Sequence, residues 1–406
     1  MNASALTTSS RISNGEFTLL VALLMSIVAI SIDALLPALG VIPRDIPLAY
    51  PNQAQLIISA IFSGMAIGQL ICGPLSDATG RKKVLYSGIA LFLCGCTLCF
   101  FAQDINTLLL GRFLQGLGVS GPYVSAISIV RDKYAGREMA KVMSLVMMIF
   151  IMVPAIAPSL GQAILFIASW RYVFVLYIVY AVIIGLWIFL RLEETLPKEN
   201  RIPLSTKGFI EGFKEVVYNR TTMGYTLCMG LFFGSFIGYL NSSQQIFQGQ
   251  FQTGKMFNVY FGLLALVFGL SSLFNSRFVE KWGMHFISQR AVLAVIISSA
   301  GFLGLHTFSA IHLWMFMAYM TIIFFSFGLI FGNVNAMAME PMGHVAGIAS
   351  AIIGSVSSVI SLVIGTFIGQ MYNDTLIPMT LGFFSMTGLA FFMMKFADRN
   401  NPNAAS

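Results

Sequence analysis

Long runs of apolar residues alternate with short polar segments along almost the whole chain. A helix needs about 20 mostly apolar residues to cross the hydrocarbon core of a bilayer, and the chain contains twelve runs of about this length or longer. The runs cover residues 17–40, 53–75, 84–102, 105–130, 139–167, 170–190, 222–247, 256–276, 286–307, 311–339, 345–371 and 376–396. The pattern therefore predicts an all-α membrane protein with twelve transmembrane helices.

The composition excludes an ordinary soluble enzyme. Of the 406 residues, 57% are hydrophobic and 10% are charged, whereas soluble domains carry about 25% charged residues. The first apolar run is longer than the apolar core of a signal peptide, and no small-residue cleavage site follows it, so we expect it to remain as the first spanning helix. No P-loop GxxxxGK[ST] is present, so we do not expect ATP to drive this chain.

The longest polar interruption, residues 192–220, has six apolar runs on either side. Its second part has the amphipathic pattern of a short helix that lies on a membrane surface. We predict an N-terminal six-helix bundle in 1–191, a cytoplasmic linker with the amphipathic helix in 192–220, and a C-terminal six-helix bundle in 221–406. A displacement of 203 residues aligns GPLSDATGRKK at 73–83 with SRFVEKWG at 276–283, which supports two pseudo-symmetric bundles.

The distribution of positive charge predicts the orientation of the chain. If the N-terminus is cytoplasmic, 19 of the 23 Lys and Arg residues fall in cytoplasmic loops and tails. Only Arg44, Arg112, Arg171 and Lys255 fall elsewhere. This is the positive-inside asymmetry, so both termini are predicted to be cytoplasmic. The net charge of +7 then orients the protein in the membrane and does not indicate a nucleic-acid partner.

Several motifs resemble those of the major facilitator superfamily. The loop at 73–83 resembles its cytoplasmic loop motif, LGRFLQGLG at 110–118 its fourth-helix arginine motif, and VPAIAPSLG at 153–161 the fifth-helix motif of its drug–proton antiporters. Three further stretches resemble the bicyclomycin-resistance and chloramphenicol-efflux branch, namely SIDALLPALG at 31–40, VRDKYAGREMAKVMS at 130–144 and NAMAMEPMGHVAGIASA at 335–351. The resemblance implies the fold of that superfamily and a monomer in a bacterial inner membrane. It also implies that the proton-motive force, and no cofactor, drives transport.

Asp33 is the only acidic residue well inside an apolar run. A charged carboxylate at the centre of a membrane helix costs about 2.5–3.5 kcal/mol on insertion scales. Burial favours the neutral form of a carboxyl and a nearby cation favours the charged form, so its protonation can follow the conformation of the protein. We predict that Asp33 is the proton-coupling site, and the alternative is a fixed structural ion pair.

Arg112 is the only basic residue well inside an apolar run. At 1.5 Å of helix per residue, Asp33 and Arg112 both fall about 10 Å below the same membrane surface, so a pair or a shared water network is expected. The resemblance also implies a role of Arg112 in proton transfer. The alternative is an arginine that only holds backbone carbonyls of a neighbouring helix. Gln115 faces the same side of its helix and is expected to join the network.

The loop motif is predicted to form a gate on the cytoplasmic side. Its glycines suit tight or left-handed backbone, and Asp77 is placed to accept hydrogen bonds from a helix N-terminus. The resemblance implies that the motif latches the two bundles together, with Arg131 and Asp132 as its charge partners. The alternative is a solvated turn. The predicted gate residues are Gly73, Asp77, Gly80, Arg81, Arg131 and Asp132.

Pro154, Pro158 and Gly161 interrupt the fifth apolar run. Proline kinks a helix because it removes a backbone hydrogen bond, and glycine lets another helix approach closely. We predict a seam between the bundles that bends or slides during gating, and the alternative is a static kink.

Aromatic and neutral polar side chains are expected to contact the substrate. The candidates are Gln115, Tyr123, Phe236, Tyr239, Asn333 and Asn335. For any one aromatic residue, core packing or lipid contact is the alternative. Asn241, Gln244 and Gln245 are also polar enough to prefer a wet interior. All five cysteines lie in apolar runs without the polar neighbours that a metal or redox site needs, so no metal is expected.

These observations predict a secondary transporter with no catalytic residues, whose partners are a small-molecule substrate, protons and the lipid bilayer. The predicted function is a proton-coupled antiporter that exports small, largely apolar drugs or toxic compounds by alternating access. Two alternatives stay open within the same fold, a proton-coupled uptake symporter and an exporter of a specific metabolite such as a sugar or siderophore. A membrane receptor or scaffold is a third.

Overall fold

The computed structural model describes residues 12–134, 136–201, 206–308 and 310–399. Within these ranges the chain forms helices and connecting loops, with no strand. The long helices are α1 Asn14–Asp33, α3 Leu56–Thr79, α4 Arg81–Phe101, α5 Ile105–Lys133, α6 Gly136–Ile167, α7 Tyr172–Arg191, α9 Arg220–Gln244, α10 Phe257–Trp282, α11 Met284–Phe308, α12 Leu313–Met339, α13 Ala346–Gln370 and α14 Ile377–Asp398. The short helices α2 Ile42–Asp45 and α8 Thr206–Tyr218 lie outside the apolar runs.

Each of the twelve apolar runs corresponds to one long helix. Within the described residues, eleven helical segments are long and apolar enough to cross a membrane, and α6 contributes the shorter apolar stretch Met152–Ile167. A helix satisfies its own backbone hydrogen bonds, so each apolar run can cross lipid in this form. The predicted all-α membrane fold is confirmed.

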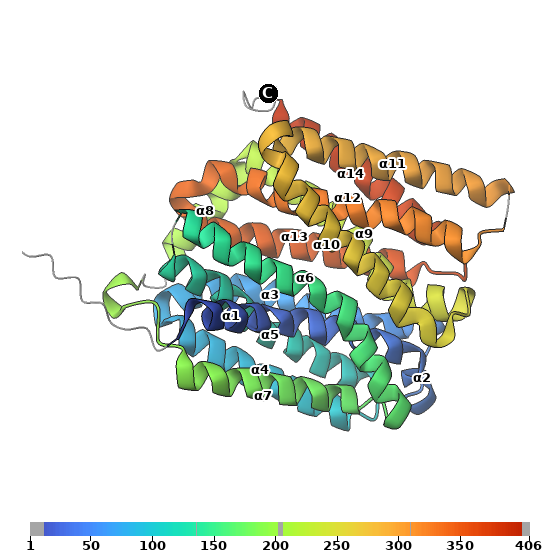
Figure 1. Ribbon diagram of the computed structural model, residues 1–406, viewed down its shortest axis with the longest axis horizontal. Coiled ribbons are helices and arrows are strands. Elements are labelled where there is room, and N and C mark those ends of the chain that lie inside the picture. The colour runs from blue at the N-terminus through green and yellow to red at the C-terminus, as the bar shows by residue number, and fades with distance from the viewer. Residues whose placement is uncertain (1–11, 135, 202–205, 309, 400–406) are drawn as a thin grey trace, which may run out of the picture.

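The helices form two bundles, one of α1 and α3–α7 and one of α9–α14 (Figure 1). In the first, α5 packs against α3 and α4, and α1 packs against α6. In the second, α9 packs against α13 and α14, and α12 packs against α10 and α11. The bundles meet where α3 packs against α13 and where α6 packs against α10, as the neighbouring ribbons in Figure 1 show. The pairing of α6 with α10 places the helix that contains Pro154 and Pro158 at the boundary between the bundles.

The two loops that the 203-residue displacement aligns have the same backbone conformation. Gly80 ends α3 with φ 103° and ψ 155°, and Gly283 ends α10 with φ 77° and ψ 152°. A positive φ of this kind favours glycine because the residue has no Cβ. In each case the next helix begins at the following residue. The repeat predicted from a degenerate sequence match is therefore real in the backbone, and the predicted left-handed turn at Gly80 is confirmed.

The bundles have two distinct ends, which we call the linker end and the far end. At the linker end the start of α1 lies beside the end of α7, where Glu16 pairs with Arg191 at 2.8 Å. There also the end of α14 lies beside the start of α9, where Arg220 Nε donates to the Phe396 carbonyl. Helix α8 lies at this end, and α2 lies at the far end (Figure 1). The terminal residues 1–11 and 400–406, which were predicted to be cytoplasmic, lie outside the described ranges.

Candidate functional site

Asp33 is the last residue of α1 and is 6% exposed. The helix ends there, and the chain continues as a 3₁₀ turn, Leu36–Gly40, that has Pro37 in its first turn. Among the described residues, no hydrogen bond or ion pair reaches the Asp33 carboxyl. The 3₁₀ turn packs on α9 of the second bundle and on α6. An acidic side chain without a counter-ion therefore lies where the two bundles meet.

Arg112 is fully buried in α5 and bonds to the backbone of two neighbouring helices. Its Nε donates to the Ile57 carbonyl of α3 at 3.1 Å, and its Nη1 donates to the Ser31 carbonyl of α1 at 2.9 Å. Nη1 also donates to Gln115 Oε1 at 2.7 Å. The direct pair that the matching depths suggested does not form, because the guanidinium points at carbonyls. Arg112 instead holds α1 two residues before Asp33.

Gln115 lies beside Arg112, as predicted, but it has no free surface for a substrate. It is fully buried, and its Nε2 contacts Cys96 Sγ at 3.2 Å while its Oε1 accepts from Arg112. The residue orients the arginine in this structure, since its side-chain amide is occupied at both ends. Cys96 and Cys99 pack in the core of the first bundle.

Two buried tyrosines lie within electrostatic reach of Asp33. They are Tyr177 of α7, which also lies within reach of Arg112, and Tyr239 of α9. Their hydroxyls have no hydrogen-bond partner among the described residues, nor has Arg112 Nη2. Buried polar atoms are normally paired, so Tyr177 and Tyr239 bring unused hydrogen-bonding capacity within electrostatic reach of the carboxyl, and Arg112 Nη2 is a third unpaired donor in the first bundle. Sequence reasoning missed Tyr177, because α7 carries three tyrosines and only packing shows which one turns inward.

Gly161 of α6 packs directly on the residue after Asp33. A Cβ built on Gly161 would lie 1.8 Å from the Ala34 carbonyl oxygen, far inside van der Waals contact. Two residues earlier, Ser159 Oγ accepts from Asn258 Nδ2 of α10 at 3.1 Å. Helix α6 therefore touches the acid-bearing segment on one side and the second bundle on the other. Pro154 and Pro158 lie inside α6, the helix that packs on α1 in the first bundle and on α10 in the second.

The aromatic candidates of α9 form one cluster with α12. Phe236 lies 5.1 Å from Phe327 and 5.4 Å from Phe324, measured between ring centroids. Tyr239 meets Phe324 edge-on, with 5.5 Å between the ring centroids, and is fully buried. Toward the first bundle, Phe233 meets Phe62 of α3 at 6.2 Å. The cluster therefore forms an apolar surface at the bundle boundary, and Phe233 and Phe236 are partly exposed in it.

The other substrate candidates are more dispersed. Asn333 of α12 is buried and exchanges two hydrogen bonds with Asn275 of α10, at 2.8 and 3.0 Å. This pairing uses its side-chain amide within the second bundle. Asn335 is exposed, and Tyr123 of α5 is partly buried. The structure therefore does not bring these three residues together with Phe236 and Tyr239.

The gate motif forms a compact ion-pair cluster at the linker end. Arg81 is 3% exposed, and its Nε and Nη2 bind both oxygens of Asp132 at 2.8 and 3.2 Å. Its Nη1 pairs with Asp77 at 2.5 Å. Thr195 Oγ1 also donates to Asp132. Arg131, in contrast, is exposed and forms no ion pair with the described acidic residues, so of the two predicted charge partners only Asp132 joins the cluster.

Contact of the gate motif with the second bundle occurs at Gly73. A Cβ built there would lie 3.3 Å from the Cβ of Ala351 in α13. The described hydrogen bonds of Arg81 stay within the first bundle and the linker. Close packing of α3 on α13, and not an ion pair across the boundary, therefore joins the two bundles at this motif.

The N-terminus of α4 is capped by Glu194 of the linker, and not by Asp77 as the sequence suggested. The Glu194 carboxylate accepts from the backbone N–H of Arg81 at 3.0 Å and of Lys82 at 3.1 Å. Asp77 cannot fill this role because it is held by the Arg81 side chain. Only the folded path of the linker brings Glu194, 113 residues from Arg81, to this helix end.

Replacing Glu194 by Gln is expected to destabilise the protein slightly. The change removes an anion from a helix N-terminus, an effect of about 0.5–1 kcal/mol at an exposed site. We expect a lower midpoint of thermal unfolding in detergent than for Glu199→Gln, whose exposed side chain lies in the same linker. Equal midpoints for the two variants would show that the cap contributes nothing.

Comparison with known proteins agrees with this geometry. Residues 17–366 match the Major Facilitator Superfamily. The chain is 33% identical to an uncharacterised transporter of this type, YdgK of Bacillus subtilis, over 90% of this chain and 92% of that protein. It is 26% identical to the bicyclomycin resistance protein homolog of Haemophilus influenzae, over 89% and 91% of the two chains.

A solved structure shows the same fold. The xylose transporter XylE from E. coli, in a partially occluded inward-open conformation, aligns with a TM-score of 0.76 at 13% identity, covering 95% of this chain and 97% of that one. Two six-helix bundles, the repeated glycine turn and the Arg81 cluster occur together with a match across most of the sequence. The chain therefore belongs to the Major Facilitator Superfamily of membrane transporters.

Proposed function

We propose that the chain exports small, largely apolar drugs or toxic compounds from the cytoplasm or the inner leaflet, in exchange for protons. The observation that carries this proposal is Asp33, a buried carboxyl that has no counter-ion among the described residues and lies where the two bundles meet. A carboxyl in such a place is stable when neutral and costly when charged. Its protonation state therefore depends on whether water can reach it between the helices, and on the side of the membrane from which that water comes.

The chemistry of the boundary supports an apolar, uncharged cargo. The partly exposed ring of Phe236 and the rings of Phe233 and Phe62 present an apolar surface between the bundles. A nutrient symporter for a polar compound would need several convergent polar groups there, yet Gln115 and Asn333 are occupied by Arg112 and Asn275. The relative named for bicyclomycin resistance supports drug export as the direction.

In the proposed cycle the linker end faces the cytoplasm, as the positive-inside rule requires. When the far end opens, Asp33 takes up a proton from the periplasm and the compound is released. The bundles then rock about their shared boundary, with α6 sliding on the segment after Asp33. When the linker end opens, Asp33 releases its proton to the cytoplasm and the next compound binds. One acid implies one proton for each molecule exported.

Tyr177, Tyr239 and Arg112 serve the proton step in this cycle. Their unpaired donors offer hydrogen bonds to the charged form of Asp33 or to water that carries the proton. Arg112 itself stays fixed, because its remaining N–H groups are bound to the carbonyls of Ile57 and Ser31.

A resistance panel tests the proposed function. The chain is expressed in a bacterial host that lacks its own efflux pumps, and growth is measured with neutral antibiotics and dyes. We expect raised resistance to several apolar compounds and lower dye accumulation, both lost when an uncoupler removes the proton gradient. Higher accumulation of a compound in cells that express the chain would instead indicate uptake and would overturn the export direction.

A further inference from the structure

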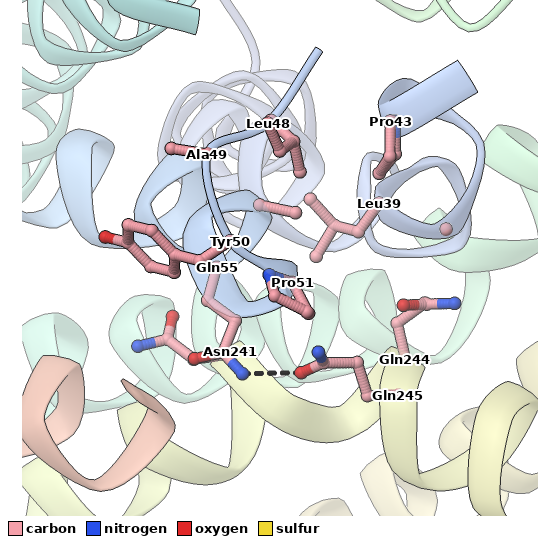
Figure 2. Close-up of a pocket in the computed structure, with 12 residues that line it drawn as sticks. Leu39, Pro43, Leu48, Ala49, Tyr50, Pro51, Gln55, Asn241, Gln244 and Gln245 are labelled. Carbon is pink, nitrogen blue, oxygen red and sulfur yellow. Dashed lines mark hydrogen bonds between the residues drawn. The ribbon is translucent and has the colours of Figure 1, made fainter. Parts of the chain in front are cut away.

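A cavity of about 490 Å³ lies at the far end between the two bundles, partly open to the outside (Figure 2). Its walls come from the first bundle and are mostly apolar, with Leu39, Pro43 and Leu48 among them. Its floor is made of amides, with Asn241, Gln244 and Gln245 from the second bundle. Within the part of the chain that the structure describes, no charged side chain lines it. This cavity is separate from Asp33, and neither the gate motif nor the aromatic cluster contributes to it.

Gln245 of the floor also belongs to a set of hydrogen-bonded amides that joins the bundles. Gln55 Nε2 donates to Gln245 Oε1 at 2.5 Å, the bond drawn in Figure 2, and Gln245 Nε2 donates to Asn52 Oδ1 at 3.0 Å. Asn52 Nδ2 donates to the carbonyls of Gln370 and Tyr372, and Gln370 Nε2 donates back to the Asn52 carbonyl at 2.8 Å. We call Asn52, Gln55, Gln245 and Gln370 the amide latch. Every member is uncharged, unlike the gate cluster at the linker end.

One polar atom of the floor is left without a partner. Asn241 is 1% exposed and its Oδ1 accepts no hydrogen bond, while its Nδ2 donates to the Gly365 carbonyl at 3.1 Å and to Ser59 Oγ at 3.2 Å. A buried acceptor left unpaired costs about 1–3 kcal/mol. A donor that enters the cavity floor can recover this energy. Directly after Gln244 the chain forms a π-helix, Gln245–Gln250, a rare element that is frequent at functional sites.

We infer that this cavity is an outer binding site for a neutral amphipathic molecule that carries hydrogen-bond donors, such as hydroxyl or amide N–H groups. The inference rests on the proposed function, because the molecule is the exported compound on its way out. The apolar walls take its hydrocarbon part, and the absence of charge at the lining selects against ions. Its polar groups pair with Asn241 Oδ1 and compete for the Gln55–Gln245 bond, so its binding favours opening of the latch.

Cysteine labelling in intact cells tests this site. Ala49, which lines the cavity, and Gln103, an exposed residue of the α4–α5 loop, are each changed to Cys. A membrane-impermeant maleimide labels them from outside in the presence of an uncoupler, with the unchanged chain giving the background of its native cysteines. We expect chloramphenicol and bicyclomycin, both neutral compounds with several donors, to slow the labelling of Ala49→Cys severalfold. Labelling of Gln103→Cys should stay unchanged.

A second substitution tests the role of the unpaired amide. Adding Asn241→Ala to the Ala49→Cys variant should raise the concentration that gives half protection about tenfold, since one buried hydrogen bond is lost. The matched control is Ser242→Ala, whose hydroxyl bonds only to carbonyls of its own helix. Normal labelling at Gln103→Cys in the same background verifies that each variant is folded in the membrane.

Three results would overturn the outer site. They are labelling of Ala49→Cys that neither compound slows, equal slowing at both cysteines, and protection that Asn241→Ala leaves intact. Failure of the proposed function looks different, because the labelling needs no proton gradient. If Asp33→Asn exported normally while Ala49→Cys stayed protected, proton coupling at Asp33 would be wrong and the outer site would hold.

Discussion

Replacing Asp33 by Asn is expected to abolish export driven by a pH gradient. Asparagine keeps the size and the neutral state of the protonated acid but cannot release a proton, so the variant stays permanently in the form that the proposed cycle assigns to outward release. Exchange of labelled for unlabelled compound without a gradient should continue at compound concentrations high enough to bind this release form, because exchange needs no net proton movement. Proteoliposomes with an imposed pH gradient, and the same vesicles in a counterflow assay, measure the two activities separately.

The matched control is Asp374→Asn. Asp374 is exposed in the far-end loop before α14 and has φ 60°, a conformation that asparagine tolerates well. We expect this variant to export like the unchanged protein. Gradient-driven export by Asp33→Asn at the control rate would exclude Asp33 as the coupling residue. Loss of both export and exchange would mean that the substitution damages binding, and that coupling is not its specific role.

Replacing Gly161 by Ala is expected to lower the export rate about tenfold, even though the change adds a single methyl group. The added Cβ would lie 1.8 Å from the Ala34 carbonyl oxygen, so α6 and the segment after Asp33 must move apart. Overpacking of this kind costs about 1–3 kcal/mol, which corresponds to roughly tenfold in a rate or a population. The displaced segment carries Asp33, the proposed coupling acid, so we expect the transport rate to fall more than the amount of protein in the membrane.

Gly301→Ala and Gly304→Ala in α11 provide the controls. A Cβ built at either position meets no atom within 4 Å, so each adds the same methyl group to a membrane helix without a collision. Transport normalised to protein in the membrane distinguishes the variants. Equal normalised rates for Gly161→Ala and the α11 controls would show that close contact between α6 and α1 is not needed for the transport cycle.

The twelve helices could be predicted because membrane helices are defined by their own sequence. Each needs a long apolar run, and no partner is required to satisfy its backbone. The residues at which the helices end were harder to predict. The run at 222–247 ends in the π-helix Gln245–Gln250, which hydropathy cannot distinguish from an α-helix. Gly80 and Gly283 were recognisable since their positive φ favours one residue type.

The candidate site could be predicted only in part. A charge in an apolar run is conspicuous, so Asp33 and Arg112 were found from the sequence. The direction in which Arg112 points was not, because carbonyls of α1 and α3 become available only when the helices pack. The matching depths of Asp33 and Arg112 in the membrane had suggested an ion pair between them. Tyr177 was missed since its unpaired hydroxyl is a property of its surroundings.

Neutral amides were the least predictable group. Asn333 and Gln245 look alike in sequence, yet one pairs with Asn275 inside a bundle and the other joins Asn52 and Gln55 across the boundary. An amide can donate and accept, so its partner is decided by the neighbouring helices. The same applies to Glu194, which reaches α4 only through the folded linker.

Proton movement driven by the transported compound is the most direct test of coupling at Asp33. Proteoliposomes with a trapped pH dye and no initial gradient receive a neutral compound from one side, and the internal pH is followed. We expect protons to move opposite to the compound, about one for each molecule, and the pH change to vanish in Asp33→Asn. Transport of the compound with no accompanying pH change, or an unchanged pH response in Asp33→Asn, would contradict an exchange cycle built on this carboxyl.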